Sequence, residues 1–477
     1  MHATTQFHPR MERKGVNHLD KKTMTIIVVV AIVAIVIVAV AVVSMNPQKD
    51  TSKSDVRYAL QVMGNADEDT TITSKDVTII EEIIAGSLSF KDYPYADANN
   101  DGKVDKADVD LVKNIIERKN GTKMYVVNVD VSSADQSKYV SEVTYPLSKI
   151  VPYGVNIVEP IVAIDGGKNV AGYFAKGYPV QEASMMGEDL KGGSRSIGDA
   201  AWKNFLTLDS KVHVDAFVIS YDNRAQLLDT YIDDLVAAGI PLICYAAANP
   251  DGEVTAALTI GFLMGGECEK LGKKYADIYE NVLDKVDAVT KKKAEADMSN
   301  YLSMIMYSSI CQNDSTYNNT GAAAGGIPYY KVDSDFAQLY KGTGSTALST
   351  VEGLSNIHAD KVLNYRSIDQ ITSSSVVKEE IIETWEHENS KKISAKMLFE
   401  HADFDNDDFY FINNVLASPI KVAYSAHILY SDSLSKEWAN SILQEFIDSG
   451  FTSYKGKTIT ENFITIFNYQ DYLDAKA

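Results

Sequence analysis

Residues 97–108 read D-A-N-N-D-G-K-V-D-K-A-D, with oxygen-bearing side chains at places one, three, five, nine and twelve. Gly102 stands at place six, where a sharp turn favours a residue without a Cβ. Calcium is a hard cation that takes roughly six to eight oxygen ligands. Because alternating acidic residues on one short loop converge on a single centre, this stretch predicts a calcium site.

A second copy of the pattern, N-A-D-E-D-T-T-I-T-S-K-D, lies at 65–76, with Thr70 in place of the glycine at place six. Each copy leads into an apolar helical pattern, and a carboxylate at place twelve favours the N-terminus of that helix. The two loops together predict about two calcium ions. The predicted metal ligands, with place seven acting through its backbone carbonyl, are Asn65, Asp67, Asp69, Thr71, Thr73, Asp76, Asp97, Asn99, Asp101, Lys103, Asp105 and Asp108.

The paired loops and helices resemble a type I dockerin, a small all-α module with EF-hand-like calcium loops, which we place at 58–122. The resemblance implies docking onto a cohesin-type module through loop places ten and eleven. Those places hold Ser74 and Lys75 in the first loop, and Lys106 and Ala107 in the second. Because the two pairs differ, the cohesin partner stays open, as does the alternative that the module packs against its own chain.

An apolar run of 18 residues without charge covers 26–43. It predicts a transmembrane anchor at 24–45, because a helix of roughly 20 apolar residues spans the hydrocarbon core. A cleaved signal peptide is the alternative, although its apolar region is usually only about 7–15 residues long. Basic residues are denser before the run than after it, so we expect a cytoplasmic tail at 1–23, a linker at 46–57 and extracellular domains beyond.

The net charge of −20 argues against a nucleic-acid partner, because a phosphate backbone requires a basic surface. The three cysteines are too few and too scattered for a disulfide framework or a zinc site.

From about residue 124, short β-branched runs alternate with helical patterns, which predicts parallel sheets covered by helices. Strands are expected at 214–221 and 240–245, then at 301–308, at 359–365 and from Pro419 onward. One long helical pattern separates the two groups. The predicted fold class is therefore α/β, with two Rossmann-like lobes at 124–262 and 298–477 joined by a long helix at 263–297.

This layout resembles the substrate-binding proteins of ABC importers for iron chelates, haem and cobalamin, of the class III periplasmic-binding-protein type. The resemblance rests on the order of stretches such as I-V-P-Y-G-V-N-I-V-E-P (150–160), V-D-A-F-V-I-S-Y (214–221) and S-T-V-E-G-L-S-N (349–356). It implies a non-catalytic subunit that captures a metal chelate, such as an iron–siderophore complex, haem or cobalamin, and delivers it to an ABC permease. By position in the family, Glu159 and Glu352 would pair with arginines of the permease.

The ligand is expected between the lobes, at loops after the carboxyl ends of strands. Aromatic side chains there would pack on a bulky chelate, and arginines would pair with its carboxylates. The candidates are Tyr173, Arg195, Trp202, Tyr221, Arg224 and Tyr245 in the first lobe, and Tyr307, Tyr329, Tyr330, Arg366 and His427 in the second.

Two other functions stay open: a dockerin-bearing cell-surface scaffold component and a glycan hydrolase. The sequence contains no G-x-S-x-G, H-E-x-x-H or Walker motif. A hydrolase would need two carboxylates facing each other across a cleft, which the sequence alone does not place.

Overall fold

The structure is a computed structural model that describes most of the chain from residue 53 onward. The described residues are 53, 54, 56–130, 138–174, 184–191, 197–221, 231–247, 250–296, 304–306, 310–313, 316–319, 347–348, 361–366, 374–386, 405, 408–413 and 415–477. The predicted tail, the predicted anchor and most of the predicted linker lie outside this set. Among the described residues, no helix combines the length and the apolar composition that a membrane span requires.

The calcium-loop module, predicted at 58–122, contains two loop–helix halves with the helices α2 (Ser74–Ile84) and α3 (Lys106–Ile116). The 3₁₀ turns η1 (Phe90–Asp92) and η2 (Pro94–Ala96) lie between these helices. Each helix starts with a capping box, in which the place-nine side chain and the place-twelve carboxylate bond each other's backbone amides. The loop pattern therefore also fixes where both helices begin.

The first lobe is built on a three-stranded parallel sheet in the order β3-β6-β7. One face carries an aromatic core in which the rings of Phe205 and Phe217 lie 5.3 Å apart. An antiparallel hairpin, β1–β2, adjoins β7 through side-chain bonds: Ser141 Oγ donates to the Leu242 carbonyl at 2.7 Å, and the Cys244 amide donates to Asn128. The elements are β1 (Lys123–Val129), β2 (Lys138–Thr144), β3 (Ile150–Tyr153), α4 (Val155–Ala163), η3 (Gly166–Asn169), β4 (Gly172–Tyr173), β5 (Glu188–Asp189), α6 (Asp199–Val212), β6 (Ala216–Ser220), α8 (Ile232–Ala238) and β7 (Leu242–Tyr245).

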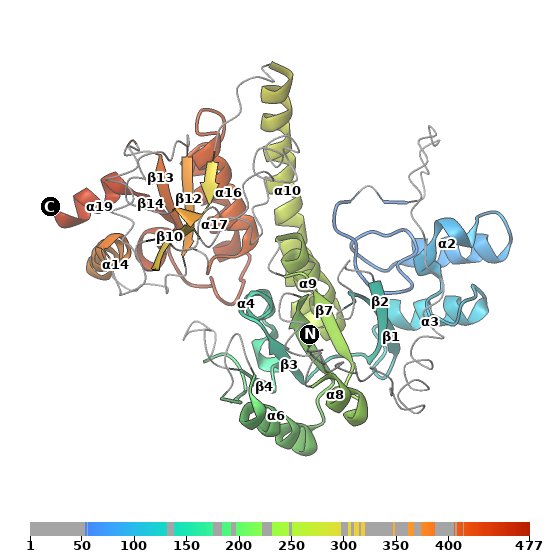
Figure 1. Ribbon diagram of the computed structural model, residues 1–477. Helices are drawn as coiled ribbons and strands as arrows, with labels where there is room; N and C mark the ends of the chain where they lie inside the picture. The colour runs from blue at the N-terminus through green and yellow to red at the C-terminus, as the bar shows by residue number, and fades with distance from the viewer. Residues whose placement is uncertain are drawn as a thin grey trace, which may run out of the picture.

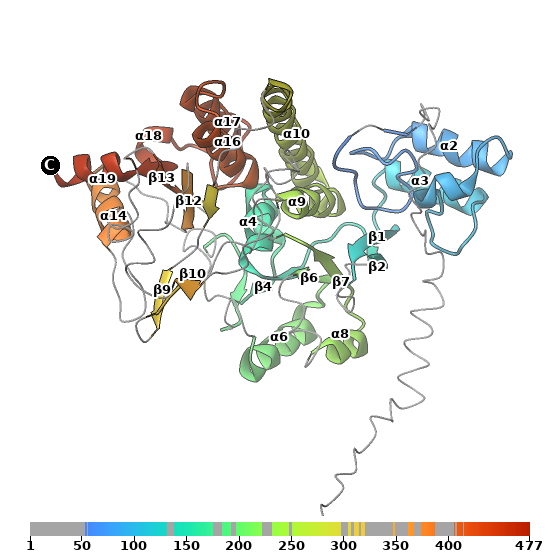
Figure 2. The same cartoon turned by 45° about the horizontal axis from the view of Figure 1, so that its top comes forward.

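Two helices leave the first lobe: α9 (Pro250–Met264) and then α10 (Gly266–Ala296), with Gly265 between them at a φ of +74°. The left-handed backbone at Gly265 allows α10 to fold back onto α9. The 31 residues of α10 form the long helix between the lobes. In Figures 1 and 2, α10 lies between the calcium-loop module and the second lobe.

The second lobe contains a four-stranded sheet in the order β14-β13-β12-β8, in which only the β13–β14 pair is antiparallel. A separate antiparallel sheet has the order β11-β10-β9. The elements are β8 (Met304–Met306), β9 (Ile310–Asn313), β10 (Thr316–Asn319), β11 (Ala347–Leu348), β12 (Lys361–Arg366), α14 (Ser374–Glu386), β13 (Phe409–Asn413), α16 (Ser418–Leu429), α17 (Lys436–Asp448), α18 (Ile459–Asn462), β14 (Ile466–Asn468) and α19 (Tyr469–Lys476).

The strand predicted from Pro419 onward is wrong, because these residues form the helix α16. Proline near the start of a helix is tolerated, since the first amides have no partner within the helix. Ten of the twelve residues of α16 are buried, and most of them are apolar. A short run of this kind has no periodicity that separates a buried strand from a buried helix.

One hydrophobic core runs through the molecule, from the calcium-loop module across α9 and α10 to α16 and α17. The two lobes also meet directly, since the Thr452 amide donates to the Ala163 carbonyl at 2.8 Å and Lys274 pairs with Glu445 at 2.5 Å. Because these parts bury the same core, moving one against another would expose apolar surface to water.

Candidate calcium loops and binding lobes

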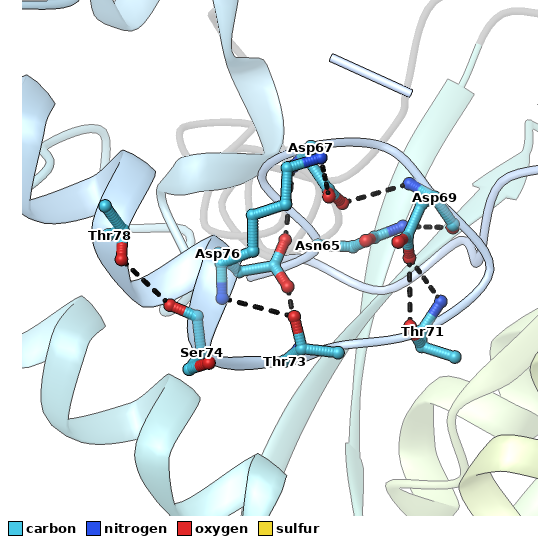
Figure 3. Close-up of polar contacts among 9 residues, drawn as sticks. Asn65, Asp67, Asp69, Thr71, Thr73, Ser74, Asp76 and Thr78 are labelled. Carbon is cyan, nitrogen blue, oxygen red and sulfur yellow. Dashed lines mark hydrogen bonds and ion pairs between the residues drawn. The ribbon is translucent and has the colours of Figure 1, made fainter. Parts of the chain in front are cut away.

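The first calcium loop folds around its own carboxylates (Figure 3). The place-twelve carboxylate, Asp76, accepts the backbone amides of Asp67 at 3.1 Å and Thr73 at 2.7 Å. The Asp69 carboxylate accepts the Thr71 amide at 2.6 Å. Asn65 is fully buried, and its Nδ2 donates to two backbone carbonyls while its Oδ1 accepts no hydrogen bond from the described residues.

The second loop repeats this arrangement with a glycine at the turn. Asp108 accepts the amides of Asn99 at 3.1 Å and Asp105 at 2.8 Å. Gly102 has a φ of +86°, and its amide donates to Asp97 at 2.7 Å. In both loops the place-twelve carboxylate thus accepts the backbone amides of places three and nine.

These loops fit a calcium ion by the chemistry of their oxygens. Burial, together with neighbouring carboxylates, raises the pKa of Asp76 to about 7 and that of Asp97 to about 6, so acidic side chains lie close together in both loops. The buried Asn65 Oδ1 is a further oxygen of the kind that calcium takes. Within the described part of the chain, no three His, Cys, Asp or Glu side chains alone are gathered into a metal site. Amide and carbonyl oxygens would complete each coordination shell.

The residues at places ten and eleven of both loops are exposed. They lie at the starts of α2 and α3, whereas Arg57, Tyr58 and Arg118 make the contacts with α9 and α10. The surface that the dockerin resemblance assigns to a partner is therefore accessible from outside.

Arg57, just before the module, and Tyr58, its first residue, attach the module to the long helices. Arg57 forms ion pairs with Glu280, Asp284 and Asp287 of α10, the one to Asp284 at 2.8 Å. The Tyr58 hydroxyl donates to Asp251 of α9 at 2.6 Å, and its buried ring lies 5.3 Å from that of Tyr279. Arg57, the last residue of the predicted linker, is thus held against α10.

The next residues extend the β1–β2 hairpin. Met63 donates its amide to the Tyr125 carbonyl at 2.8 Å, and Val127 donates to the Gln61 carbonyl at 2.9 Å. Val62 and Val126 form the antiparallel bridge between them. The segment thus adds a short third strand-like edge to the first lobe.

Arg118, after α3, forms the third attachment. Its guanidinium bonds both carboxylate oxygens of Glu269 on α10 and lies 4.3 Å from the centre of the Phe262 ring on α9. Its Nη1 also donates to the Ile115 carbonyl at 2.5 Å. Through these contacts the module packs on its own chain. The sequence did not reveal Arg57 or Arg118, because their partners lie more than 150 positions away.

The parallel sheets place some predicted ligand residues at the carboxyl ends of strands, where α/β proteins bind ligands. Tyr221 directly follows β6, Tyr173 ends β4, and both side chains are buried with less than a tenth of their surface exposed. Arg366 is the last residue of β12 and pairs with Asn413 in the parallel ladder. These three keep positions compatible with the prediction.

Other predicted ligand residues are occupied within the lobes. Trp202 is buried, stacks on Tyr231 at 4.4 Å between ring centres, and donates from Nε1 to Asp234 at 2.7 Å. Tyr245 is 3% exposed and belongs to the continuous core. Both rings therefore pack inside the first lobe. Arg195, Arg224, Tyr307, Tyr329 and Tyr330 lie outside the described residues.

His427 is half-buried on α16, and its Nδ1 lies 2.8 Å from the Leu434 carbonyl. A neutral ring that donates there is held by its own lobe, and this contact fixes the ring's orientation. The bond gives His427 a local structural role.

Glu159 was predicted to contact a permease on the surface, and its position is inconsistent with that role. It lies on α4 with 9% of its surface exposed, and the Tyr275 hydroxyl of α10 is 3.4 Å from its Oε2. A carboxylate inside the molecule does not reach a partner's arginine. The second predicted docking residue, Glu352, lies outside the described residues.

Next to Glu159 is a second buried carboxylate, Glu253 of α9, which joins the two lobes. It accepts the Ser418 amide at 2.8 Å and the Ser418 hydroxyl at 2.7 Å, and it bonds the Tyr275 hydroxyl. Lys421 of α16 lies 3.7 Å away. Burial and the adjoining carboxylates raise the pKa of Tyr275 well above its ordinary value. No local pattern predicts this cluster, since Glu253 looks like an ordinary acidic residue in the first turn of a helix.

Comparison with known families confirms the predicted module: the Dockerin type I domain matches residues 64–117. A search of curated proteins found no match to this chain. Among solved structures, the chain is similar to the TroA-like periplasmic binding protein FepB from Veillonella parvula, at 13% identity and a TM-score of 0.46, covering 72% of this chain and 99% of that one. It is also similar to a periplasmic haem-binding protein from Pseudomonas aeruginosa, at 13% identity and a TM-score of 0.38, covering 60% of this chain and 94% of that one.

The molybdate periplasmic binding protein MolA from Haemophilus influenzae is a further similar structure, at 10% identity and a TM-score of 0.42, covering 69% of this chain and 99% of that one.

Proposed function

We propose that this protein is the extracellular substrate-binding subunit of an ABC importer for a metal chelate, held at the membrane by an N-terminal anchor. The observation that carries the proposal is the pairing of two lobes, each with parallel strands, across the single long helix α10. Such lobes present loops at the carboxyl ends of their strands, and a ligand binds where these loops face each other. The role is non-catalytic.

The continuous core supports capture with little change of shape. Lobe contacts through α16, α17 and α10 bury apolar side chains, and the Glu253 cluster adds buried hydrogen bonds between the lobes. A preformed site loses less conformational entropy on binding than a flexible one. The subunit would therefore recognise its chelate and its permease in nearly one conformation.

The dockerin module adds a calcium-dependent role in assembly. Its loops supply the oxygens for calcium, and its exposed places ten and eleven are open to a cohesin-type partner. Since the module is attached to α9 and α10 at three points, a partner bound there would hold the binding lobes in a fixed orientation.

Titration of the purified full-length protein in detergent with haem, a ferric siderophore and cobalamin tests the proposal. Absorption spectra should show saturable binding of one of these ligands, with about one ligand per chain. Arg366→Met should weaken the binding, while Lys106→Met, in the module, should leave it unchanged. No saturable binding of any chelate, together with calcium-dependent capture by cohesin modules, would favour the scaffold function instead.

A further inference from the structure

Lys75 occupies place eleven of the first loop, and its ammonium lies on one of the predicted calcium ligands. Nζ is 2.8 Å from Asp67 Oδ2, the Asp67 side chain is completely buried, and half of the Lys75 side chain is exposed. The negative charges of Asp69 and Asp76 attract the same ammonium.

The second loop lacks this feature. Its place eleven is Ala107, and Lys106 at place ten pairs along the helix with Asp110 at 2.8 Å. Within the described residues, no lysine or arginine forms an ion pair with Asp97, Asp101, Asp105 or Asp108. Its turn also has the glycine that the first loop replaces by Thr70, so the two loops differ in both geometry and charge.

A second observation shows that the first loop still has a place for a metal ion. Asn65 is fully buried, and Figure 3 shows its side chain inside the ring of loop residues. Its Nδ2 donates to the carbonyls of Leu60 at 2.9 Å and Asp69 at 2.8 Å, which fixes the amide's orientation. Its Oδ1 then accepts nothing from the described residues. The ammonium of Lys75 therefore neutralises Asp67 without completing the loop's coordination.

We propose that Lys75 is a tethered competitor for calcium, so that the first loop binds calcium more weakly than the second. Calcium needs an oxygen of Asp67, so it must displace the ammonium before it coordinates fully. Because Lys75 stands in the first turn of α2, the displaced ammonium turns outward onto the exposed surface at places ten and eleven. Calcium at the first loop thus changes the charge that a docking partner meets. This inference rests on the proposed calcium-binding function of the module.

Calcium titration of the full-length protein by calorimetry tests the inference. The unmodified protein should show two sites of unequal affinity. Lys75→Met should tighten the weaker site by about tenfold, the factor that a charge-assisted hydrogen bond contributes. Lys106→Met removes the same charge from the equivalent turn of the second loop and should leave both sites almost unchanged.

Amine labelling of the unmodified protein, read by mass spectrometry, gives a test that needs no variant. Lys75 should react several-fold faster with calcium than without it, while Lys106 should react equally under both conditions. Two equal sites with no effect of Lys75→Met, or Lys75 labelling that calcium does not change, would overturn the inference and leave calcium binding standing. Absence of calcium binding at both loops would overturn the proposed function of the module as well.

Discussion

Replacing Arg118 by methionine should loosen the whole module from the binding lobes. The substitution keeps most of the side chain's length but removes the paired bonds to Glu269 and the contact with the Phe262 ring. The Arg118 and Glu269 side chains are 26% and 27% exposed, so the pair is shielded from solvent more than an ordinary surface pair. Glu269 would remain with water as its partner, so the cost stays below that of breaking a fully buried pair.

The two contributions give the size of the effect. A charged hydrogen-bonded pair is worth about 1.5–3 kcal/mol, and a cation–π contact adds about 0.5–1 kcal/mol. After discounting for partial exposure, we expect the free energy of unfolding to fall by about 2–3 kcal/mol. For a unit of this size, that loss corresponds to a fall in Tm of roughly 5–10 °C.

Scanning calorimetry of the full-length protein with saturating calcium measures this change. Lys106→Met is the matched control, because it removes an exposed pair along one helix and should cost less than about 0.5 kcal/mol. The module and the first lobe should unfold in one transition in the unmodified protein. An Arg118→Met variant as stable as the control, or a module that unfolds in its own separate transition, would refute the shared attachment.

Three further outcomes are expected. Removal of calcium with a chelator should lower the unfolding temperature of the first lobe as well as that of the module. A ligand that binds only the folded state stabilises every part of the protein that unfolds in the same transition. A transition of the lobe that stays at the same temperature in calorimetry would contradict this. Glu253→Gln should lower the free energy of unfolding by about 1–3 kcal/mol, because the new NH2 group cannot accept the hydrogen bonds that Ser418 and Tyr275 donate to the carboxylate. A free energy from chemical denaturation equal to that of the unmodified protein would count against the cluster's role. Trp202→Phe should lower the free energy of unfolding by about 1–2 kcal/mol, because it loses the hydrogen bond to Asp234 and stacks less well on Tyr231. We expect the chelate affinity to be unchanged. A large loss of affinity in a stably folded variant would show that Trp202 contacts the ligand.

Local patterns carry most of what the sequence predicts correctly. The loop residues bond within about ten positions of each other, so their spacing alone indicates both turns and both helix starts. The alternation of strands and helices likewise indicates two α/β lobes before any contact is known. The long helix, predicted at 263–297, is α10 at Gly266–Ala296, and α9 precedes it after the turn at Gly265.

Contacts between distant residues are what the sequence does not reveal. Arg57 meets Asp284 across 227 positions, and Glu253 meets Ser418 across 165. Glu159 lies beside Tyr275 for the same reason: burial is decided by which helix packs on α4, and no local signal records it. The residues at 419–424 were misread because an apolar segment suits either a buried strand or a buried helix.

The central claim is that the two lobes capture a metal chelate while the dockerin module holds calcium. The most direct test is to purify the protein from native membranes and to record its visible absorption spectrum and metal content on one sample. We expect a chromophore with iron or cobalt at about one per chain, and calcium rising to about two per chain when calcium is saturating. Calcium alone, with no chelate bound after incubation with haem, siderophores and cobalamin, would contradict the claim.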